Sequence, residues 1–585
     1  MFCTNCGREN PDGSKFCTGC GAPVNQAPQQ EWQAPQQNFQ PEQAAGAWAS
    51  ASPRVKQKNR WLVPAVIAVV VVAVAALGAL NFKAMSAFVT RAFSSPEKFY
   101  RSIDKASAAE ISGSVAAAYD NLVLGNADIG NGSFTGGVSL EVGDAARDLI
   151  VDYAGTYLDR VNYGDDLSWL DNIALTFDTG GKDGLRGADL GLDLNGQTIL
   201  TLSAVVDRDD EAVYIAIPEL SNDYMELPLE DFRYMFGYDF PLSRMLDPEN
   251  MEGLEAALKA LPDDAQVEKL VKRYLECALD CVDNVEKGKG TLSAGGISAK
   301  YTTLKVTIDG ETLADMVRAI GAEMRKDKEL EKIIVDVAEA AGEDGAADYD
   351  AFLDSLDDMI DDADDIEDSL DDDIVMTLYV DNKNAVRGRI IEYDDFRFAF
   401  AMPSKGSDFG LEISIESGRD ELRIAGAGKR GGSKVNGDFD VEFSDERYAT
   451  IGLDQIELGK LKKGYLAGGI TLTLSEEIWD AMYLPATVSS ILEDFSFRFD
   501  FDTSRDKSVV ALSVLDGREL FLTLTAENAA AADKKIAAVR DGIDPDDWAE
   551  ELTVDKLEDI LDRLKRAGVP SEYTDYIDSW LPFLI

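Results

Sequence analysis

Four cysteines near the start of the chain have the spacing of a metal site. Cys3 and Cys6 form one C-x-x-C pair, and Cys17 and Cys20 form a second pair after ten intervening residues. A glycine follows each pair and allows the positive φ that turns backbone N–H groups toward sulfur. Four thiolates in a tetrahedron favour Zn²⁺, with iron and two disulfides as alternatives. The sequence therefore predicts one structural zinc ion, because four protein ligands leave no coordination position open.

The segment around these cysteines is too short to fold on a hydrophobic core. In MFCTNCGRENPDGSKFCTGCGAPV only Phe2, Phe16 and Val24 offer apolar packing. Metal binding worth about 10–16 kcal/mol must supply the stability of residues 1–24. The segment resembles the N-terminal zinc ribbons of bacterial, Gram-positive-type, single-pass membrane proteins. That resemblance implies zinc at Cys3, Cys6, Cys17 and Cys20 and implies no particular activity.

Residues 61–80 form an uncharged apolar run, WLVPAVIAVVVVAVAALGAL. A helix of this length is about 30 Å long, which matches the hydrocarbon thickness of a bilayer. Four basic residues are clustered just before the run, and this bias places the N-terminus in the cytosol. We therefore expect a transmembrane helix at 61–80, a cytoplasmic N-terminus and an extracytoplasmic C-terminal part. A cleaved signal peptide is the alternative.

The charge of the chain is strongly acidic and unevenly distributed. The 585 residues have a formal net charge of −52 and include no histidine, and residues 81–585 alone carry −54. Such a surface repels nucleic acid and anionic headgroups. The two basic residues of the ribbon are balanced by two acidic ones, so we expect no nucleic-acid partner. The expected partners are the bilayer, a cytosolic protein bound by the ribbon and an extracytoplasmic ligand of unknown identity.

Composition and periodicity divide the rest of the chain. Residues 25–60 are rich in Gln, Pro and Ala and end in the basic cluster, which predicts a disordered linker. We expect a multi-domain protein with a small zinc ribbon, one transmembrane helix and a large α+β outer domain that has antiparallel sheets and a helical insert. Its expected parts are a helical stalk at 81–125, a β-rich subdomain at 130–245, a mainly helical insert at 246–373, a second β-rich subdomain at 374–530 and C-terminal helices at 531–585.

Several short patterns support this organisation. Ser95-Pro96-Glu97 is a helix start, and Asn195-Gly196 and Asp516-Gly517 predict two similar hairpins, which leaves an internal duplication open. Helical spacing places Cys277 and Cys281 on one face of a helix expected over 249–287, as small buried side chains. The acidic run 343–373 predicts an amphipathic helix with a solvated face, with calcium binding as the alternative.

The sequence gives little sign of catalysis. General acid–base catalysis most often uses histidine, and the chain has none and also lacks G-x-S-x-G and P-loop motifs. We therefore expect a membrane-anchored, non-enzymatic binding or structural protein. The alternatives are an extracytoplasmic carrier of a lipid or cell-wall precursor, which a deep apolar pocket would favour, and a carboxylate-dependent envelope hydrolase, which a cleft with paired acids would favour.

Overall fold

A computed structural model of the chain describes residues 94–579 apart from gaps, the longest of which are 121–132, 158–166, 232–259, 479–494 and 531–541. The described residues belong to one compact unit, Val66–Ile585. The expected ribbon, linker and apolar span, and residues 81–93 of the expected stalk, lie outside the described residues.

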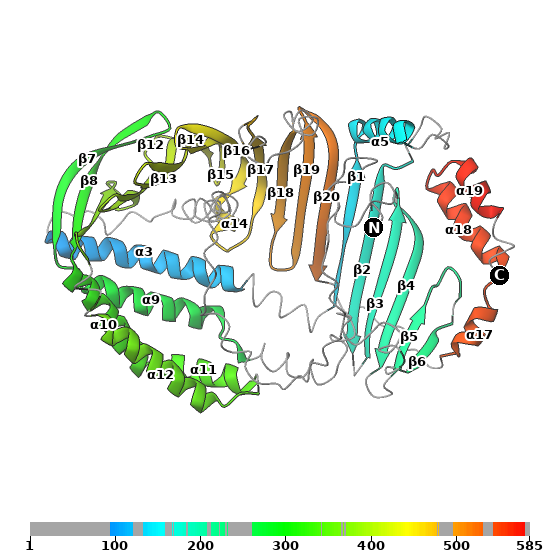
Figure 1. Ribbon diagram of the computed structural model, residues 1–585, viewed down its shortest axis with the longest axis horizontal. Coiled ribbons are helices and arrows are strands. Elements are labelled where there is room, and N and C mark those ends of the chain that lie inside the picture. The colour runs from blue at the N-terminus through cyan, green and yellow to red at the C-terminus, as the bar shows by residue number, and fades with distance from the viewer. Residues whose placement is uncertain are drawn as a thin grey trace, which may run out of the picture. The chain divides into compact units, whose positions relative to one another are not determined.

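Twenty strands within the described residues form one sheet (Figure 1). They are β1 (Phe134–Val142), β2 (Asn172–Lys182), β3 (Leu185–Leu194), β4 (Gln197–Asp207), β5 (Ala212–Ala216), β6 (Met225–Pro228), β7 (Val285–Ala294), β8 (Ile297–Ile308), β9 (Ile374–Val380), β10 (Val386–Tyr393), β11 (Phe396–Ala401), β12 (Ser404–Lys405), β13 (Asp408–Ser417), β14 (Asp420–Gly431), β15 (Lys434–Phe443), β16 (Glu446–Glu457), β17 (Ala467–Leu474), β18 (Phe495–Thr503), β19 (Lys507–Asp516) and β20 (Glu519–Ala530).

The strands pair antiparallel and almost entirely in chain order. From β7 to β20 each strand pairs with the next one, except that β11 pairs with β13 and the short β12 also lies against β13. β20 then pairs with β1, and β1 to β6 continue the sheet. The order of the strands across the sheet therefore runs from β7 to β20 and then from β1 to β6. The pairing of β20 with β1 joins two groups of strands that are separate in the sequence.

Local sequence explains the turns of this meander. Asn195 and Gly196 join β3 and β4 with φ values of 51° and 75°, the positive φ that a two-residue type I′ turn requires. Gly517, with φ of 60°, lies in the turn between β19 and β20. Both hairpins predicted from the sequence are therefore confirmed.

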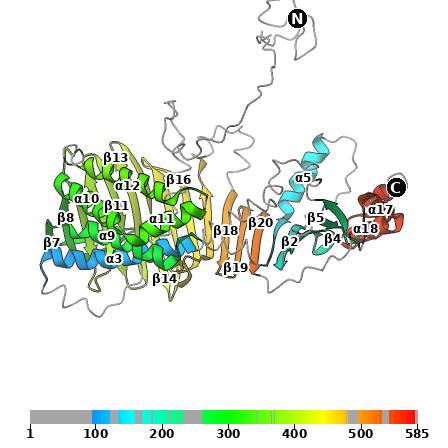
Figure 2. The same cartoon turned by 90° about the horizontal axis from the view of Figure 1, so that it is seen from below.

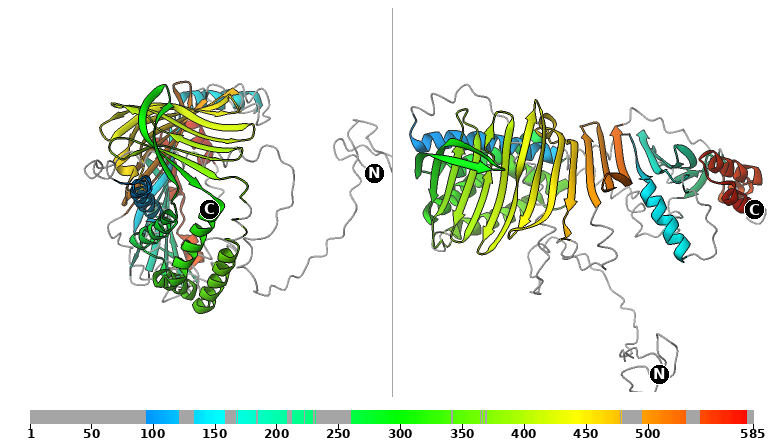
Figure 3. Two further views of the ribbon diagram at one scale, coloured as in Figure 1. Left: turned by 90° about the vertical axis from the view of Figure 1, so that its left-hand side faces the viewer. Right: turned by 90° about the horizontal axis from the view of Figure 1, so that it is seen from above.

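The described helices are α3 (Pro96–Tyr119), α5 (Asp144–Tyr157), α9 (Asp264–Asp280), α10 (Gly310–Lys326), α11 (Lys328–Ala340), α12 (Gly345–Asp361), α14 (Leu458–Leu461), α17 (Pro545–Glu550), α18 (Val554–Arg566) and α19 (Ser571–Asp578). Figure 2 shows α9 to α12 across the half of the sheet that runs from β7 to β16, whereas α5 contacts β20 in the other half. From the opposite side, the strands of that half lie in front of these helices, and the orange strands β18 to β20 continue the sheet beyond them (Figure 3, right). The helices therefore cover only part of one face.

Helix α3 begins where the sequence predicts a helix start. The Ser95 hydroxyl accepts a hydrogen bond from the Lys98 backbone N–H, and Pro96 occupies the first turn, where a missing N–H is least costly. Its first turns place Phe99, Tyr100 and Ile103 in a core with residues of β7 to β9, among them Leu304 and Leu378. These two leucines are fully buried. Packing against the sheet, rather than helix propensity alone, therefore fixes α3.

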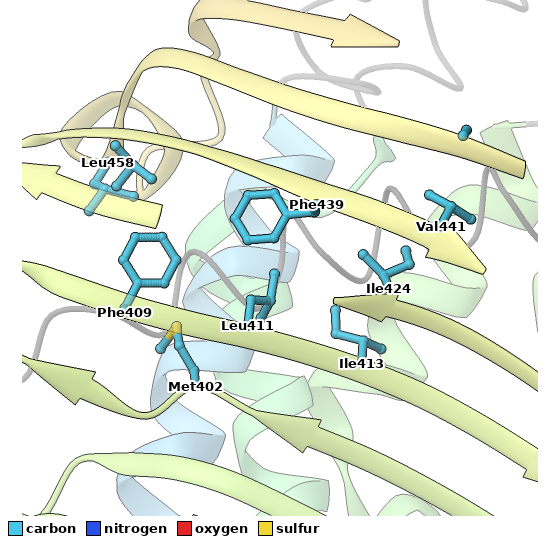
Figure 4. Packing of buried hydrophobic residues seen from close by; sticks show 10 residues of the cluster. Met402, Phe409, Leu411, Ile413, Ile424, Phe439, Val441 and Leu458 are labelled. Carbon is cyan, nitrogen blue, oxygen red and sulfur yellow. The ribbon is translucent and has the colours of Figure 1, made fainter. Parts of the chain in front are cut away.

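A second core cluster lies over β13 to β16 (Figure 4). Its side chains come from successive strands and share one face of the sheet. α14 adds Leu458, and the segment between β11 and β12 adds Met402. The buried members are Met402, Phe409, Leu411, Ile413, Ile424, Val435, Phe439, Val441, Ala449 and Leu458.

A partly buried ion pair ties α3 to the middle of this half of the sheet. The Arg389 guanidinium on β10 donates to the Asp104 carboxylate at 2.6 Å, and the Asp104 side chain is only 2% exposed. The nearby Tyr100 is also buried. Burial and then the Asp104 charge raise the pKa of Tyr100, so its hydroxyl stays protonated. Charge pairing therefore adds to the apolar contacts that hold α3 against the sheet.

Two features differ from the sequence expectation. The helix expected to reach residue 287 ends at Asp280, and β7 begins at Val285. Gly288 and Gly290 lie in β7 and oppose helix formation there, while pairing with β8 supplies the backbone hydrogen bonds. The second difference is that strands from the two separate β-rich segments belong to one sheet. Long-range pairing of β20 with β1 joins them, and no local pattern encodes that pairing.

The predicted single-pass membrane location is wrong on the evidence of the described residues. None of the described helices is long and apolar enough to cross a membrane. α3, the longest of them at 24 residues, bears charges along its length, among them Lys98, Asp104 and Glu110, which hydrocarbon would not solvate. The apolar run 61–80, on which that expectation was based, lies outside the described residues.

The ion pair leads to a stability prediction. Replacing Asp104 by alanine leaves Arg389 without its carboxylate, so we expect Asp104→Ala to lower the free energy of unfolding by about 2–3 kcal/mol. Urea-induced unfolding measures this loss. Lys105→Ala is the matched control, because the next residue of α3 forms a more exposed pair with Asp280 and its loss is expected to cost less than about 0.5 kcal/mol. Equal losses in the two variants would contradict the anchoring role of Asp104.

Candidate functional site

Strand register gives the sheet one apolar face. Residues directly opposite each other in an antiparallel pair share a face. Leu524 of β20 lies opposite Leu512 of β19, Leu512 opposite Phe499 of β18, and Phe499 opposite Ile470 of β17. Ile470 lies opposite Leu453 of β16, which packs against the core cluster over β13 to β16. The face that forms the core under α3 therefore continues across β17 to β20.

On β20 and on the strands that follow it in the sheet, β1 to β4, this apolar face is exposed to solvent. Val138 of β1 lies opposite Leu175 of β2, and Leu175 lies opposite Leu192 of β3. Leu190 of β3 lies opposite Leu202 of β4. We call the exposed large apolar residues of these five neighbouring strands the apolar patch; they are between 38% and 50% exposed and comprise Val138, Leu175, Leu190, Leu192, Leu202 and Leu524.

One border of the apolar patch is covered. At the strand ends beside the Asn195-Gly196 turn, Val142 and Leu194 are buried. Leu194 packs against Leu564 of α18 and against Ala567, which caps the C-terminus of that helix. The exposure of the apolar patch is therefore a property of the strand centres and not of frayed strand ends.

Over its middle strands the opposite face of the sheet is polar and charged, whereas towards the two ends it holds buried apolar clusters, one with Leu292 and Tyr301 and one with Val205 and Tyr214. On β1, Thr135 and Ser139 alternate with the residue of the apolar patch. Farther along, Arg423 of β14 bridges Glu412 and Glu442 on the neighbouring strands at 3.0 and 2.6 Å. Hydrogen bonds to Asp500 and Asp454 raise the pKa of Arg498 on β18. Solvent and ion pairs therefore satisfy this face, whereas the apolar patch has no comparable polar groups.

A hollow on the polar face is the nearest match to the carboxylate chemistry considered above. It is lined by Glu421, Arg423, Glu442, Ser444 and Asp445. Burial, and then the charge of Glu416, raise the pKa of Glu421. Arg423 lies between the carboxylates and forms an ion pair with Glu442. The arrangement is a charged cluster in which Arg423 pairs with Glu412 and Glu442.

The two cysteines of the described residues are free thiols on α9. The Cys281 thiol donates a weak hydrogen bond to the Cys277 carbonyl. Burial raises the pKa of both thiols, and the charge of Glu323 adds to the effect at Cys277, as does that of Asp315 at Cys281. A raised pKa lowers the thiolate fraction, which disfavours a nucleophilic role.

The acidic run contains the expected helix. α12 spans Gly345–Asp361, begins with Asp344 accepting hydrogen bonds from the N–H groups of Ala346 and Ala347, and buries Leu356. Within the described ranges no group of three or more His, Cys, Asp and Glu side chains could hold a metal ion. The acidic residues of this helix therefore serve as a solvated face.

Sequence reasoning located the strands of the apolar patch but not their exposure. The alternation of residues such as Val138, Leu175 and Leu190 indicated strands with one apolar face but did not indicate what covers that face. The predicted metal ligands Cys3, Cys6, Cys17 and Cys20 lie outside the described residues.

Comparison with known proteins identifies the N-terminal segment. Residues 2–24 match the zinc-ribbon domain family. No curated protein and no solved structure matches the chain. A zinc ribbon indicates a zinc-binding or nucleic-acid-binding type of function. The chain thus combines a zinc ribbon with a large antiparallel sheet and helices, while a bacterial origin of the Gram-positive type stays a prediction.

The donor set of the ribbon fits zinc. Four cysteine thiolates in two C-x-x-C pairs supply the soft, tetrahedral ligands that structural Zn²⁺ prefers. Zinc would stabilise the fold of the ribbon, because the segment has too little apolar surface to fold without metal. The assignment of all four cysteines to one ion stays a prediction.

Metal analysis of the full chain tests that assignment. We expect about one zinc per chain in the unmodified protein and a loss of most of it in Cys17→Ser, because three thiolates hold the ion much less tightly. Inductively coupled plasma mass spectrometry measures the content. Cys277→Ser is the control and should retain the metal. A chain that loses zinc equally in both variants, or that holds iron, would overturn the assignment.

The raised thiol pKa values predict slow alkylation. At pH 8 we expect iodoacetamide to modify Cys277 and Cys281 at least threefold more slowly in the folded chain than in urea, because fewer thiolates form. The rate should rise as the pH increases past the ordinary thiol pKa. Peptide mass spectrometry follows each cysteine separately. Equal rates in folded and unfolded protein would show that burial does not protect these thiols.

Proposed function

We propose that this chain is a non-enzymatic binding protein that holds its ligand on the apolar patch and uses its zinc ribbon to bind a protein partner. The observation behind the proposal is the gathering of six large aliphatic side chains on neighbouring positions of β20 and β1 to β4. Contiguous exposed apolar surface in a soluble domain marks an interaction site, whereas single exposed leucines do not.

The chemistry of the chain supports binding rather than catalysis. It has no histidine, and burial keeps the two described thiols protonated. The four cysteines of the ribbon would fill the coordination shell of zinc, so the ion has a structural role. The ribbon is too small and too nearly neutral to favour nucleic acid, which the acidic remainder of the chain repels. A protein partner is therefore the better match for the ribbon.

A neutral hydrophobic dye tests the binding surface. Nile red should bind the full chain and fluoresce, and Val138→Asp should reduce the bound fluorescence severalfold, because the new carboxylate lies within the apolar patch, directly opposite Leu175. Val138 is 41% exposed, so the variant is expected to fold. Circular dichroism and thermal unfolding check that expectation.

The matched control is Thr135→Asp. Thr135 lies on the same strand, is exposed and points to the opposite face. It adds the same charge at almost the same place in the chain, so it should leave dye binding unchanged. If both variants lose the dye equally, or if neither does, the apolar patch is not the binding surface.

A further inference from the structure

Resting on the proposed function, we infer that the apolar patch binds the acyl chains of a single lipid molecule whose headgroup is uncharged or zwitterionic. The inference names the class of ligand, which the proposal above leaves open. It follows from the side-chain composition of the surface, the pairing of its strands and the charge of the chain.

The composition of the apolar patch favours acyl chains over a protein partner. All six of its residues are leucine or valine, and the aromatic residue beside them on the same face, Phe177 opposite Leu190, is half-buried against Phe134. Protein interfaces draw most of their binding energy from Trp, Tyr and Arg, and Leu and Val are under-represented among such residues. An acyl chain has no hydrogen-bonding group, so aliphatic side chains alone can solvate it.

Strand pairing leads to the same conclusion. β1, β2 and β3 each pair with a neighbour on both sides, so their backbone N–H and C=O groups are already used in the sheet. A peptide could not add to these strands through main-chain hydrogen bonds, which is the common way for a sheet to bind an extended segment. What remains available is the apolar surface of the side chains.

Charge limits the occupant further. The chain has a formal net charge of −52, so two copies repel each other and a second copy is a poor occupant of the apolar patch. The same field repels anionic headgroups. An uncharged or zwitterionic headgroup escapes this penalty while its acyl chains cover the leucines.

The extent of the apolar patch suits an extended chain. Its residues lie on five consecutive strands, β20, β1, β2, β3 and β4. Four spacings of about 4.8 Å give a width of about 19 Å across the strands. Because each CH₂ group adds a similar increment of apolar contact, affinity should rise with chain length by about fourfold per CH₂ group until the apolar patch is covered.

The test uses the full chain and lysophosphatidylcholines of increasing chain length. Each lipid is kept below its micellar concentration, and binding is followed by displacement of Nile red. We expect affinity to increase with chain length. Leu175→Ser and Val138→Asp should each weaken binding about tenfold or more, and Thr135→Asp should stay within twofold of the unmodified chain. Leu175→Ser adds no charge, so it separates lost apolar contact from repulsion.

Each other outcome overturns the inference in a recognisable way. No lipid binding, or binding without dependence on chain length, excludes acyl chains as the ligand. Flotation of the protein with phosphatidylcholine vesicles, without uptake of single lipids, would assign the apolar patch to a membrane surface instead. A dimer in sedimentation that Val138→Asp abolishes would assign it to a second copy. In these cases the dye difference between Val138→Asp and Thr135→Asp would persist, so the proposed binding surface stands; if that difference is absent, both proposals fail.

Discussion

A slip of one residue in the register of a strand moves every apolar side chain of that strand to the other face of the sheet. One apolar face is continuous from β8 to β4 even where bulges interrupt the pairing, and the other face carries buried apolar clusters only towards the ends of the described sheet. Between Leu453 and Ile456 of β16 the chain takes an extra residue, with Gln455 at φ of 54°. The bulge returns Ile456 to the face of Val435, and both are almost fully buried. The register of the strands therefore determines which face of the sheet is apolar and must be covered by other parts of the protein or by a ligand.

The described helices cover that apolar face of the sheet unevenly. The first half of α3 packs against the sheet through Phe99, Tyr100 and Ile103, and its second half buries small residues such as Ala108 and Ala116. α9 packs along α3. This arrangement lets two helices approach closely over one half of the sheet. The Asp104–Arg389 ion pair also fixes the orientation of α3 on the sheet, which apolar contacts alone do not fix. Over β2 and β3, α18 covers only the ends near Ile173 and Leu194, and the same kind of face is left exposed at the strand centres.

The sequence predicts the local parts of this arrangement well. The Ser95 cap, the Asn195-Gly196 hairpin and the alternation of the strands follow from backbone preferences within a few residues. It does not predict the pairing of β1 with β20, because nearly 400 positions separate the partners, as between Val138 and Ala526, and alternation is the same in any sheet. The exposure of the apolar patch depends on which helix covers which strand, and no local pattern encodes that choice. The zinc site, in contrast, is predicted from the positions of four cysteines alone, and that prediction needs no knowledge of the fold.

The magnitude of the exposed apolar surface limits how tightly the apolar patch can hold a ligand. Burying a leucine or valine completely is worth about 1.5–3 kcal/mol, and the six residues are already about half covered, so roughly 4–8 kcal/mol remains in total. That range corresponds to dissociation constants from about millimolar to micromolar before the entropy of association is subtracted. A surface of this kind binds and releases its ligand readily. Tight, permanent occupancy would need additional cover of the kind that α3 gives to the other half of the sheet.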